Sequence, residues 1–392
     1  MRPNPTTFAV AATAAVATAV IATAVIATTV SLLPVEVRLF AQGAGNGAAT
    51  PAALAPSAMN NPYHLVTNWP HLGDIKPGAA IGILSDGKGG VWLQHRSVPG
   101  VLHINAAGNI IDKWDVTFST AHGFCRDGDG NFWVLDSGPF TDAPDAGVKG
   151  NQVFKYTPAG KLLLTIGKAG VSKAGPDTFL QPSACVATPG GDILIADGHW
   201  SRPSGGPQDG DRLVLYRKDG TFLKSIGKQG SRPGEFMGPH GLAFDSKGRL
   251  FVADRSNNRI QIFDKDMRYL DEWRQFGRPS GIQILKDDTL VVSDSESTFG
   301  QFKPAELGPV RPGDYTVDWA GFYKGIPRNA GWRNGIRIGS ARDGSLKYFI
   351  PDVLAEGLGA DDFGNVYGGL TTGCDVSPSG GCLQKWTLKA AR

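Results

Sequence analysis

The sequence predicts an all-β fold, a six-bladed β-propeller with four antiparallel strands in each blade. Two observations support this prediction. One unit of sequence, made of a strand, a polar turn and a second strand, recurs six times between residues 81 and 370. The 392 residues also include 53 glycines and 26 prolines beside many aliphatic and aromatic residues, a mix typical of short strands joined by turns. Repeated sheets that cannot cover both of their own faces pack around an axis.

The repeat is clearest in PHGLAFDSKGRLFVADRSNNRIQIFD, residues 239–264. With His240 as position zero, the turn glycine Gly248 stands at position eight and Asp254 at position fourteen. The same spacing fits five further stretches, which begin at Ile81, His122, Ser183, Ser280 and Glu356. We interpret four aspartates at position fourteen as architectural residues that tie strand ends to loops, namely Asp136, Asp197, Asp254 and Asp294.

Three segments are expected along the chain. Residues 1–42 contain an uncharged stretch from Phe8 to Leu33 and are interpreted as a signal peptide or an uncleaved membrane anchor, with export and cleavage favoured. Residues 43–62 are expected to form a flexible Ala/Gly/Pro/Ser linker, and residues 63–392 the propeller. The last repeat has only three strands. The segment YHLVTNWP, residues 63–70, is therefore predicted to complete the sixth blade and close the ring.

The charge of the chain limits the classes of partner that we expect it to bind. The formal net charge is +3, and lysine and arginine are scattered without a basic run, which gives no case for nucleic acid or an acidic membrane surface. We expect an exported monomer, periplasmic or secreted, with a small-molecule or peptide substrate in its central channel. Membrane attachment is expected only if the N-terminal segment stays uncleaved.

The chain has four cysteines. Cys374 and Cys382 bracket a loop rich in proline and glycine, and in an exported protein we expect them to form a disulfide. Cys125 and Cys185 fall inside strand patterns and are expected to be buried thiols. None of the four shows a paired CxxC spacing, so no thiolate metal site is predicted.

Position zero starts the innermost strand of each blade, so its six residues are expected to ring one mouth of the channel. In blade order they are Ile81, His122, Ser183, His240, Ser280 and Glu356. His122, His240 and Glu356 occupy alternate blades and are predicted to converge about a third of a turn apart. Such a set leaves positions open for water and substrate, as catalytic zinc requires, although manganese or iron fits the same ligands. The alternative is that these side chains bind only water and backbone in a solvated channel.

The unit GEFMGPHGLAFDSKGRLFVADRSNNRIQIFD, residues 234–264, resembles an NHL repeat, and the resemblance covers Tyr63 to Lys389. The arrangement is similar to the lyase domain of peptidylglycine α-amidating enzymes. That resemblance implies a zinc ion held by three histidines in the cavity of a six-bladed propeller, and cleavage of peptidyl-α-hydroxyglycine into a peptide amide and glyoxylate. Glu356 stands where the third histidine is expected; a carboxylate can still bind a metal there, but it makes the site less positive. Gly357 stands where an aspartate is expected, which weakens the inference of a structural calcium ion.

Residues just after position fourteen are expected to share the mouth of the channel with position zero. Arg96 and His199 are in such places. The resemblance implies an arginine and a tyrosine base there, so Arg96 matches and His199 replaces the tyrosine. We expect Arg96 to bind a substrate carboxylate and His199 to act as the general base. The alternatives are a surface ion pair for Arg96 and a partly exposed loop position for His199.

Three functions remain open from the sequence. The first is an exported metalloenzyme, a lyase or a hydrolase. The second is a binding propeller that presents a recognition surface on its long insertions, residues 138–150, 200–211 and 300–335. The third, a calcium-dependent lactonase-like propeller, requires more channel carboxylates and asparagines than position zero supplies. Fold alone does not choose among them.

Overall fold

A computed structural model of the chain describes residues 59–138, 148–199, 210–297, 329, 332–371, 374 and 381–388. The expected signal or anchor segment, the linker up to residue 58 and most of the three long insertions lie outside these residues. Within the described ranges, no helix is long and apolar enough to span a membrane. The only helix among them is a single 3-10 turn, η1 (Arg255–Asn257).

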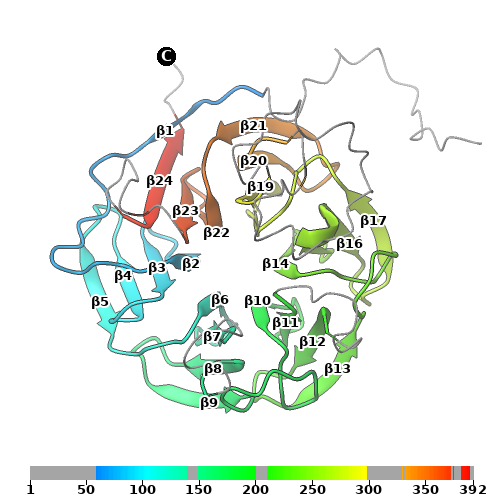
Figure 1. Cartoon of the computed structure of the whole chain (residues 1–392). Coiled ribbons are helices and arrows are strands. Elements are labelled where there is room, and N and C mark those ends of the chain that lie inside the picture. Colours follow the sequence, from blue (N-terminus) through cyan, green and yellow to red (C-terminus); the bar gives the residue numbers. More distant parts are fainter. Residues whose placement is uncertain are drawn as a thin grey trace, which may run out of the picture. The chain divides into compact units, whose positions relative to one another are not determined.

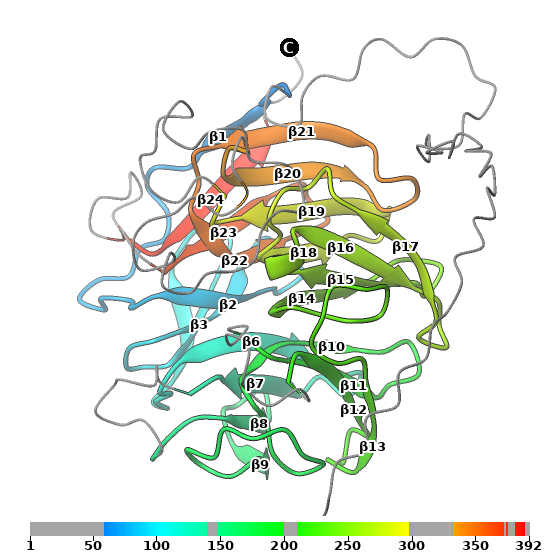
Figure 2. The same cartoon turned by 45° about the vertical axis from the view of Figure 1, so that its right-hand side comes forward.

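The strands of the described part form six four-stranded antiparallel sheets arranged around a common axis (Figures 1 and 2). The strands of each blade are given from the innermost to the outermost. Blade one consists of β2 (Ala80–Ser85), β3 (Val91–His95), β4 (Val101–Ile104) and β5 (Ile110–Trp114), and blade two of β6 (Ala121–Arg126), β7 (Phe132–Asp136), β8 (Gln152–Tyr156) and β9 (Leu162–Ile166). Blade three consists of β10 (Pro182–Ala187), β11 (Ile193–Asp197), β12 (Arg212–Tyr216) and β13 (Phe222–Ile226). Blade four consists of β14 (Pro239–Phe244), β15 (Leu250–Asp254), β16 (Arg259–Phe263) and β17 (Tyr269–Trp273). Blade five consists of β18 (Gly281–Ile284), β19 (Thr289–Asp294), β20 (Gly335–Ser340) and β21 (Leu346–Pro351). Blade six consists of β22 (Ala355–Ala360), β23 (Val366–Leu370), β24 (Leu383–Leu388) and β1 (Tyr63–Leu65). The predicted six-bladed propeller is confirmed.

The sixth blade is built from both ends of the folded domain. Its outermost strand, β1, pairs antiparallel with β24, so that Tyr63 lies opposite Leu388 and Leu65 opposite Trp386. The ring of Tyr63 is buried and meets Tyr348 of blade five edge to face, with centroids 6.1 Å apart. The N-terminal strand therefore closes the ring, as the sequence predicted.

Burial decreases from the inner strands of a blade to its outer strand. Every residue of β7 is buried, whereas β9 buries only its last residue, Ile166. Apolar side chains fill the space between neighbouring blades, where Trp133 and Leu135 of blade two pack in one cluster with Ile193 and Ile195 of blade three. A strand enclosed on both faces consists mainly of apolar residues, as in β7, whose sequence is FWVLD.

The four aspartates at position fourteen have the architectural role predicted for them. Each buried carboxylate accepts a hydrogen bond from a backbone N–H of the segment that leads into the innermost strand of its own blade. The pairs are Asp136 with Thr120 at 2.6 Å, Asp197 with Gln181 at 2.9 Å, Asp254 with Met237 at 2.7 Å and Asp294 with Arg278 at 3.0 Å. Asp197, Asp254 and Asp294 also pair with an arginine of the third strand. These bonds fix the start of the strand that carries position zero.

Both pairs of cysteines form disulfides. The predicted bond between Cys374 and Cys382 is present. The expectation of free thiols at Cys125 and Cys185 is wrong, because these residues are bonded to each other with their Cα atoms 5.7 Å apart. They lie on β6 and β10, the innermost strands of neighbouring blades. The sequence repeat describes the strands within one blade, so it could not predict this contact between two blades. Two disulfides indicate an oxidising environment.

Loss of the closing strand should destabilise the whole ring. A chain without residues 1–70 lacks β1 and the buried Trp69, and removing two large aromatic side chains from the core should lower the melting temperature by at least about 5 °C. A chain without residues 1–58 keeps β1 and serves as the matched control, with an unchanged melting temperature. Equal melting temperatures in a thermal scan would contradict closure by β1.

The two disulfides should differ in their effect on stability. They close loops with sequence separations of 60 and 8 residues. By chain entropy these bonds stabilise the fold by about 4 and about 2.5 kcal/mol. Denaturant titration should therefore show a larger loss for Cys125→Ala/Cys185→Ala than for Cys374→Ala/Cys382→Ala. The reverse order would show that the bond between blades does not restrain the unfolded chain as expected.

Candidate metal centre

The innermost strands enclose a small cavity on the propeller axis. Its volume is about 70 Å³, and its lining includes all six position-zero residues, Ile81, His122, Ser183, His240, Ser280 and Glu356. The spacing of the repeat thus identified, from sequence, the residues that face the axis.

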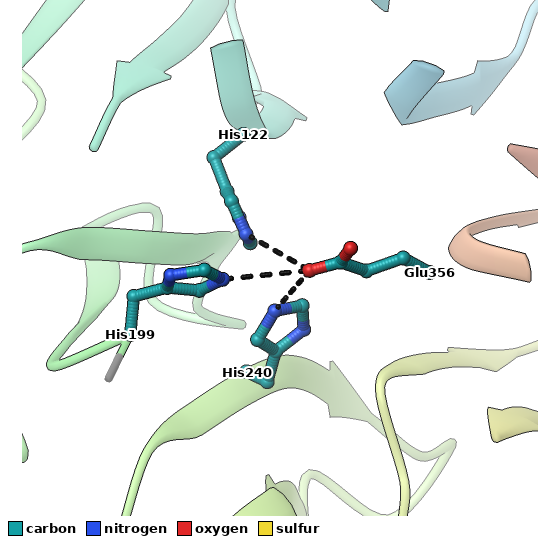
Figure 3. Close-up of side chains that lie close together, drawn as sticks. All are labelled: His122, His199, His240 and Glu356. Atoms are coloured by element: carbon teal, nitrogen blue, oxygen red, sulfur yellow. Dashed lines mark hydrogen bonds and ion pairs between the residues drawn. The ribbon is translucent and has the colours of Figure 1, made fainter. Parts of the chain in front are cut away.

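His122, His240 and Glu356 meet at one carboxylate oxygen (Figure 3). Oε1 of Glu356 lies 3.1 Å from Nε2 of His240 and 3.6 Å from Nε2 of His122. The three side chains come from β22, β14 and β6, so blades six, four and two each contribute one. Both imidazoles are 1% exposed and the carboxylate is 13% exposed. The structure therefore brings together the three residues that the sequence predicted as metal ligands.

The neighbouring blade orients each of these two imidazoles. Nδ1 of His122 lies 2.5 Å from the carbonyl oxygen of Ser183, and Nδ1 of His240 lies 2.8 Å from that of Ser280. A carbonyl oxygen only accepts hydrogen bonds, so Nδ1 carries the proton and Nε2 presents a lone pair to the centre. Histidines that bind metals are held by the same kind of bond from their second nitrogen.

His199 lies in the same cluster. It follows β11 of blade three, is 3% exposed, and its Nε2 is 3.4 Å from Oε1 of Glu356. Its ring centroid is 4.4 Å from that of His122 and 5.0 Å from that of His240. The ligand atoms of all four residues lie within 4.8 Å of one another. The sequence placed His199 beside the predicted ligands as a base, and the structure places its Nε2 as near to Glu356 as theirs.

The electrostatics of the cluster pose a conflict. Burial lowers the pKa of all three histidines, that of His240 to about 3. Burial acts to raise the pKa of Glu356, but its contacts with the three imidazoles outweigh burial and hold that pKa well below its usual range. An imidazole stabilises the carboxylate in this way only with a proton on Nε2, yet burial disfavours a second proton on an imidazole that already carries one on Nδ1. A cation among the four residues would resolve the conflict.

Arg255 supplies a positive charge that the sequence analysis missed. It lies in η1, is 1% exposed, and its Nη1 is 3.3 Å from Oε1 of Glu356 and 3.8 Å from Oε1 of Glu296. Its Nη2 donates to the carbonyl oxygen of His199 at 3.1 Å. Arg255 directly follows Asp254 at position fourteen, the same place that identified Arg96 in blade one, so the repeat contained the signal.

Arg96 lies near the cluster without touching it. Its Nε donates to the carbonyl oxygen of Ala121 at 3.3 Å, and no carboxylate of the described part pairs with its guanidinium. Burial lowers the pKa of Arg96, while the charges of Glu356 and Asp136 oppose that effect. Arg96 is thus half-buried, positively charged and available to an anion.

The donor set fits a divalent cation. Ligand atoms at the usual zinc distances lie about 3.3 Å from one another in a tetrahedron. The three separations between imidazole nitrogens and Oε1 of Glu356 are 3.1, 3.4 and 3.6 Å. Nε2 of His122 is buried and has no hydrogen-bond partner within the described part of the chain. Imidazole and carboxylate together suit zinc, iron, manganese and cobalt.

The structure explains the glycine at residue 357. A Cβ atom added to Gly357 would lie 2.3 Å from the carbonyl oxygen of Ile81 in the adjoining blade. An aspartate does not fit this position without moving the backbone of blade one. The chain therefore lacks the aspartate on which the inference of a structural calcium ion depended.

Comparisons with known proteins agree with the repeat pattern. The NHL repeat matches residues 236–263. NHL repeat-containing protein 3 of Mus musculus is 31% identical over 247 residues, which are 60% of this chain and 67% of that protein. The peptidyl-glycine alpha-amidating monooxygenase of Mus musculus is 32% identical over 159 residues, which are 38% of this chain and 14% of that protein. The chain thus spans about two thirds of the first protein and a small part of the second.

A solved structure shows the same fold. A gluconolactonase of Xanthomonas campestris superposes with a TM-score of 0.52 over 87% of this chain and 94% of its own, at 17% identity. Similarity at this level of sequence identity shows that the two proteins share the propeller fold and gives no information on the reaction.

Proposed function

This chain belongs to the NHL-repeat family, and from that premise we propose that it is a metal-dependent lyase related to the amidating lyases, exported to an oxidising compartment. The observation that carries the proposal is the convergence of buried imidazoles and one carboxylate on a single point at the propeller axis. Buried lone pairs that face one another are unfavourable without a cation between them. The two disulfides support the exported location.

Peptidyl-α-hydroxyglycine is the first substrate to consider. In this reaction the hydroxyl group on the glycine Cα loses its proton and becomes a carbonyl, the bond from Cα to nitrogen breaks, and the nitrogen takes up a proton. The products are a peptide amide and glyoxylate. A divalent cation held by His122, His240 and Glu356 would polarise a substrate oxygen as a Lewis acid.

The two arginines near the centre have different roles in this proposal. Arg255 is already paired with Glu356 and Glu296, so it holds the carboxylate ligand in place. Arg96 has no carboxylate partner in the described part of the chain and is available to the carboxylate of a hydroxyglycine substrate. A centre that includes Glu356 is less positive than a centre with three neutral histidine ligands. Binding of an anionic substrate therefore depends more strongly on the positive charge of Arg96.

Metal content tests the centre itself. Protein stripped with a chelator and reloaded should hold one divalent ion per chain by elemental analysis. His122→Ala, His240→Ala and Glu356→Ala should each lose most of that ion while remaining folded, because none of the three belongs to the apolar clusters that pack the blades together. His103→Ala is the matched control, since His103 pairs with Asp86 and stacks on Trp92 away from the cluster.

Turnover tests the reaction with the same proteins. The reloaded wild type should release glyoxylate from a peptidyl-α-hydroxyglycine, and Arg96→Gln should lower kcat/KM by about 10- to 100-fold, the loss of one charged hydrogen bond. Bound metal without glyoxylate release would reject this substrate. Wild-type protein that takes up no metal after reloading would reject the proposed function.

A further inference from the structure

His199 is buried, and neighbouring side chains hold its backbone in place. Its side chain is 4% exposed, and its backbone carbonyl accepts a hydrogen bond from Nη2 of Arg255. The backbone carbonyl of Arg255 in turn accepts from Nη1 of Arg278 at 3.1 Å, and Arg278 pairs with Glu296 at 2.7 Å. Two buried arginines and an acid of blades four and five thus hold a residue from blade three.

By its distance from Glu356, His199 does not differ from the other two imidazoles. Its Nε2 lies 3.4 Å from Oε1 of Glu356, between the values of 3.1 Å for His240 and 3.6 Å for His122. In Figure 3 the three rings approach the same oxygen from different sides. An ion placed to reach His122 and His240 from this oxygen is therefore within reach of His199 as well.

A base role for His199 would compete with this position. A general base must keep its lone pair available for a substrate proton. Nε2 of His199 faces Glu356 inside the cluster, and the centre would bind this same nitrogen.

We propose that His199 is a fourth metal ligand, and that the centre is a three-histidine, one-glutamate site for a five- or six-coordinate divalent ion such as Mn²⁺, Fe²⁺ or Co²⁺. This inference rests on the proposed function and deepens it. Four protein ligands fill the tetrahedron that structural zinc prefers and leave no position for a substrate. An ion that takes five or six ligands keeps at least one open position with all four residues bound.

Cobalt tests this proposal without any substrate. Co²⁺ absorbs visible light strongly when four ligands surround it as a tetrahedron and weakly when it has five or six. Metal-free full-length protein should bind one Co²⁺ per chain by calorimetry, with weak visible absorption. His199→Ala should bind Co²⁺ more weakly by at least about 100-fold, beyond the loss typical of a residue that only supports a ligand. His199→Gln keeps the size of the side chain and should show the same loss if the alanine variant fails to fold.

His71→Ala is the matched control, because His71 is exposed, bonds to Asn109 and is not a member of the cluster. It should bind Co²⁺ as the wild type does. Wild-type affinity in His199→Ala, together with loss of binding in His122→Ala, would overturn the ligand role of His199 and leave the proposed function standing. Strong tetrahedral absorption by the wild type would overturn the coordination number. A wild type that binds no Co²⁺ would reject this proposal and the proposed function together.

Discussion

The pairing of β1 with β24 is the interaction on which the remaining structure depends. It joins the first strand of the folded domain to the last one and turns six sheets into a closed ring. The four cluster residues, His122, His199, His240 and Glu356, come from four blades and lie far apart along the sequence. No local segment brings them together. Their meeting at the axis is a property of the closed ring, held further by the bond between Cys125 and Cys185 of adjoining blades.

The charges and lone pairs buried at the centre are only partly compensated by other groups of the protein. Arg255 places one positive charge beside Glu356, at 3.3 Å from the oxygen that the three imidazoles also approach. Hydrogen bonds to the carbonyls of Ser183 and Ser280 hold two imidazoles with their lone pairs directed inward. Burial opposes the protons that would otherwise turn these imidazoles into donors. A bound cation is the simplest partner for this arrangement.

The fold could be predicted from the sequence because its signals are local and repeated. The distance from His240 to Gly248 and Asp254 recurs, and it located both the strands and the residues that face the axis. Contacts between blades could not be found in this way. The pairing of Cys125 with Cys185 depends on the spacing of two neighbouring blades, which no repeat encodes. The position of His199 depends on how the segment after β11 turns towards the axis. Arg255 is different, because its place after Asp254 was visible and only its significance was missed.

Anomalous X-ray scattering from crystals of metal-loaded protein would test the central claim most directly. Data collected at the absorption edge of the bound metal should show one strong peak per chain, about 2.0–2.3 Å from the Nε2 atoms of His122, His199 and His240 and from a carboxylate oxygen of Glu356. A map without a peak at the axis, or with a peak held by other residues, would contradict the account.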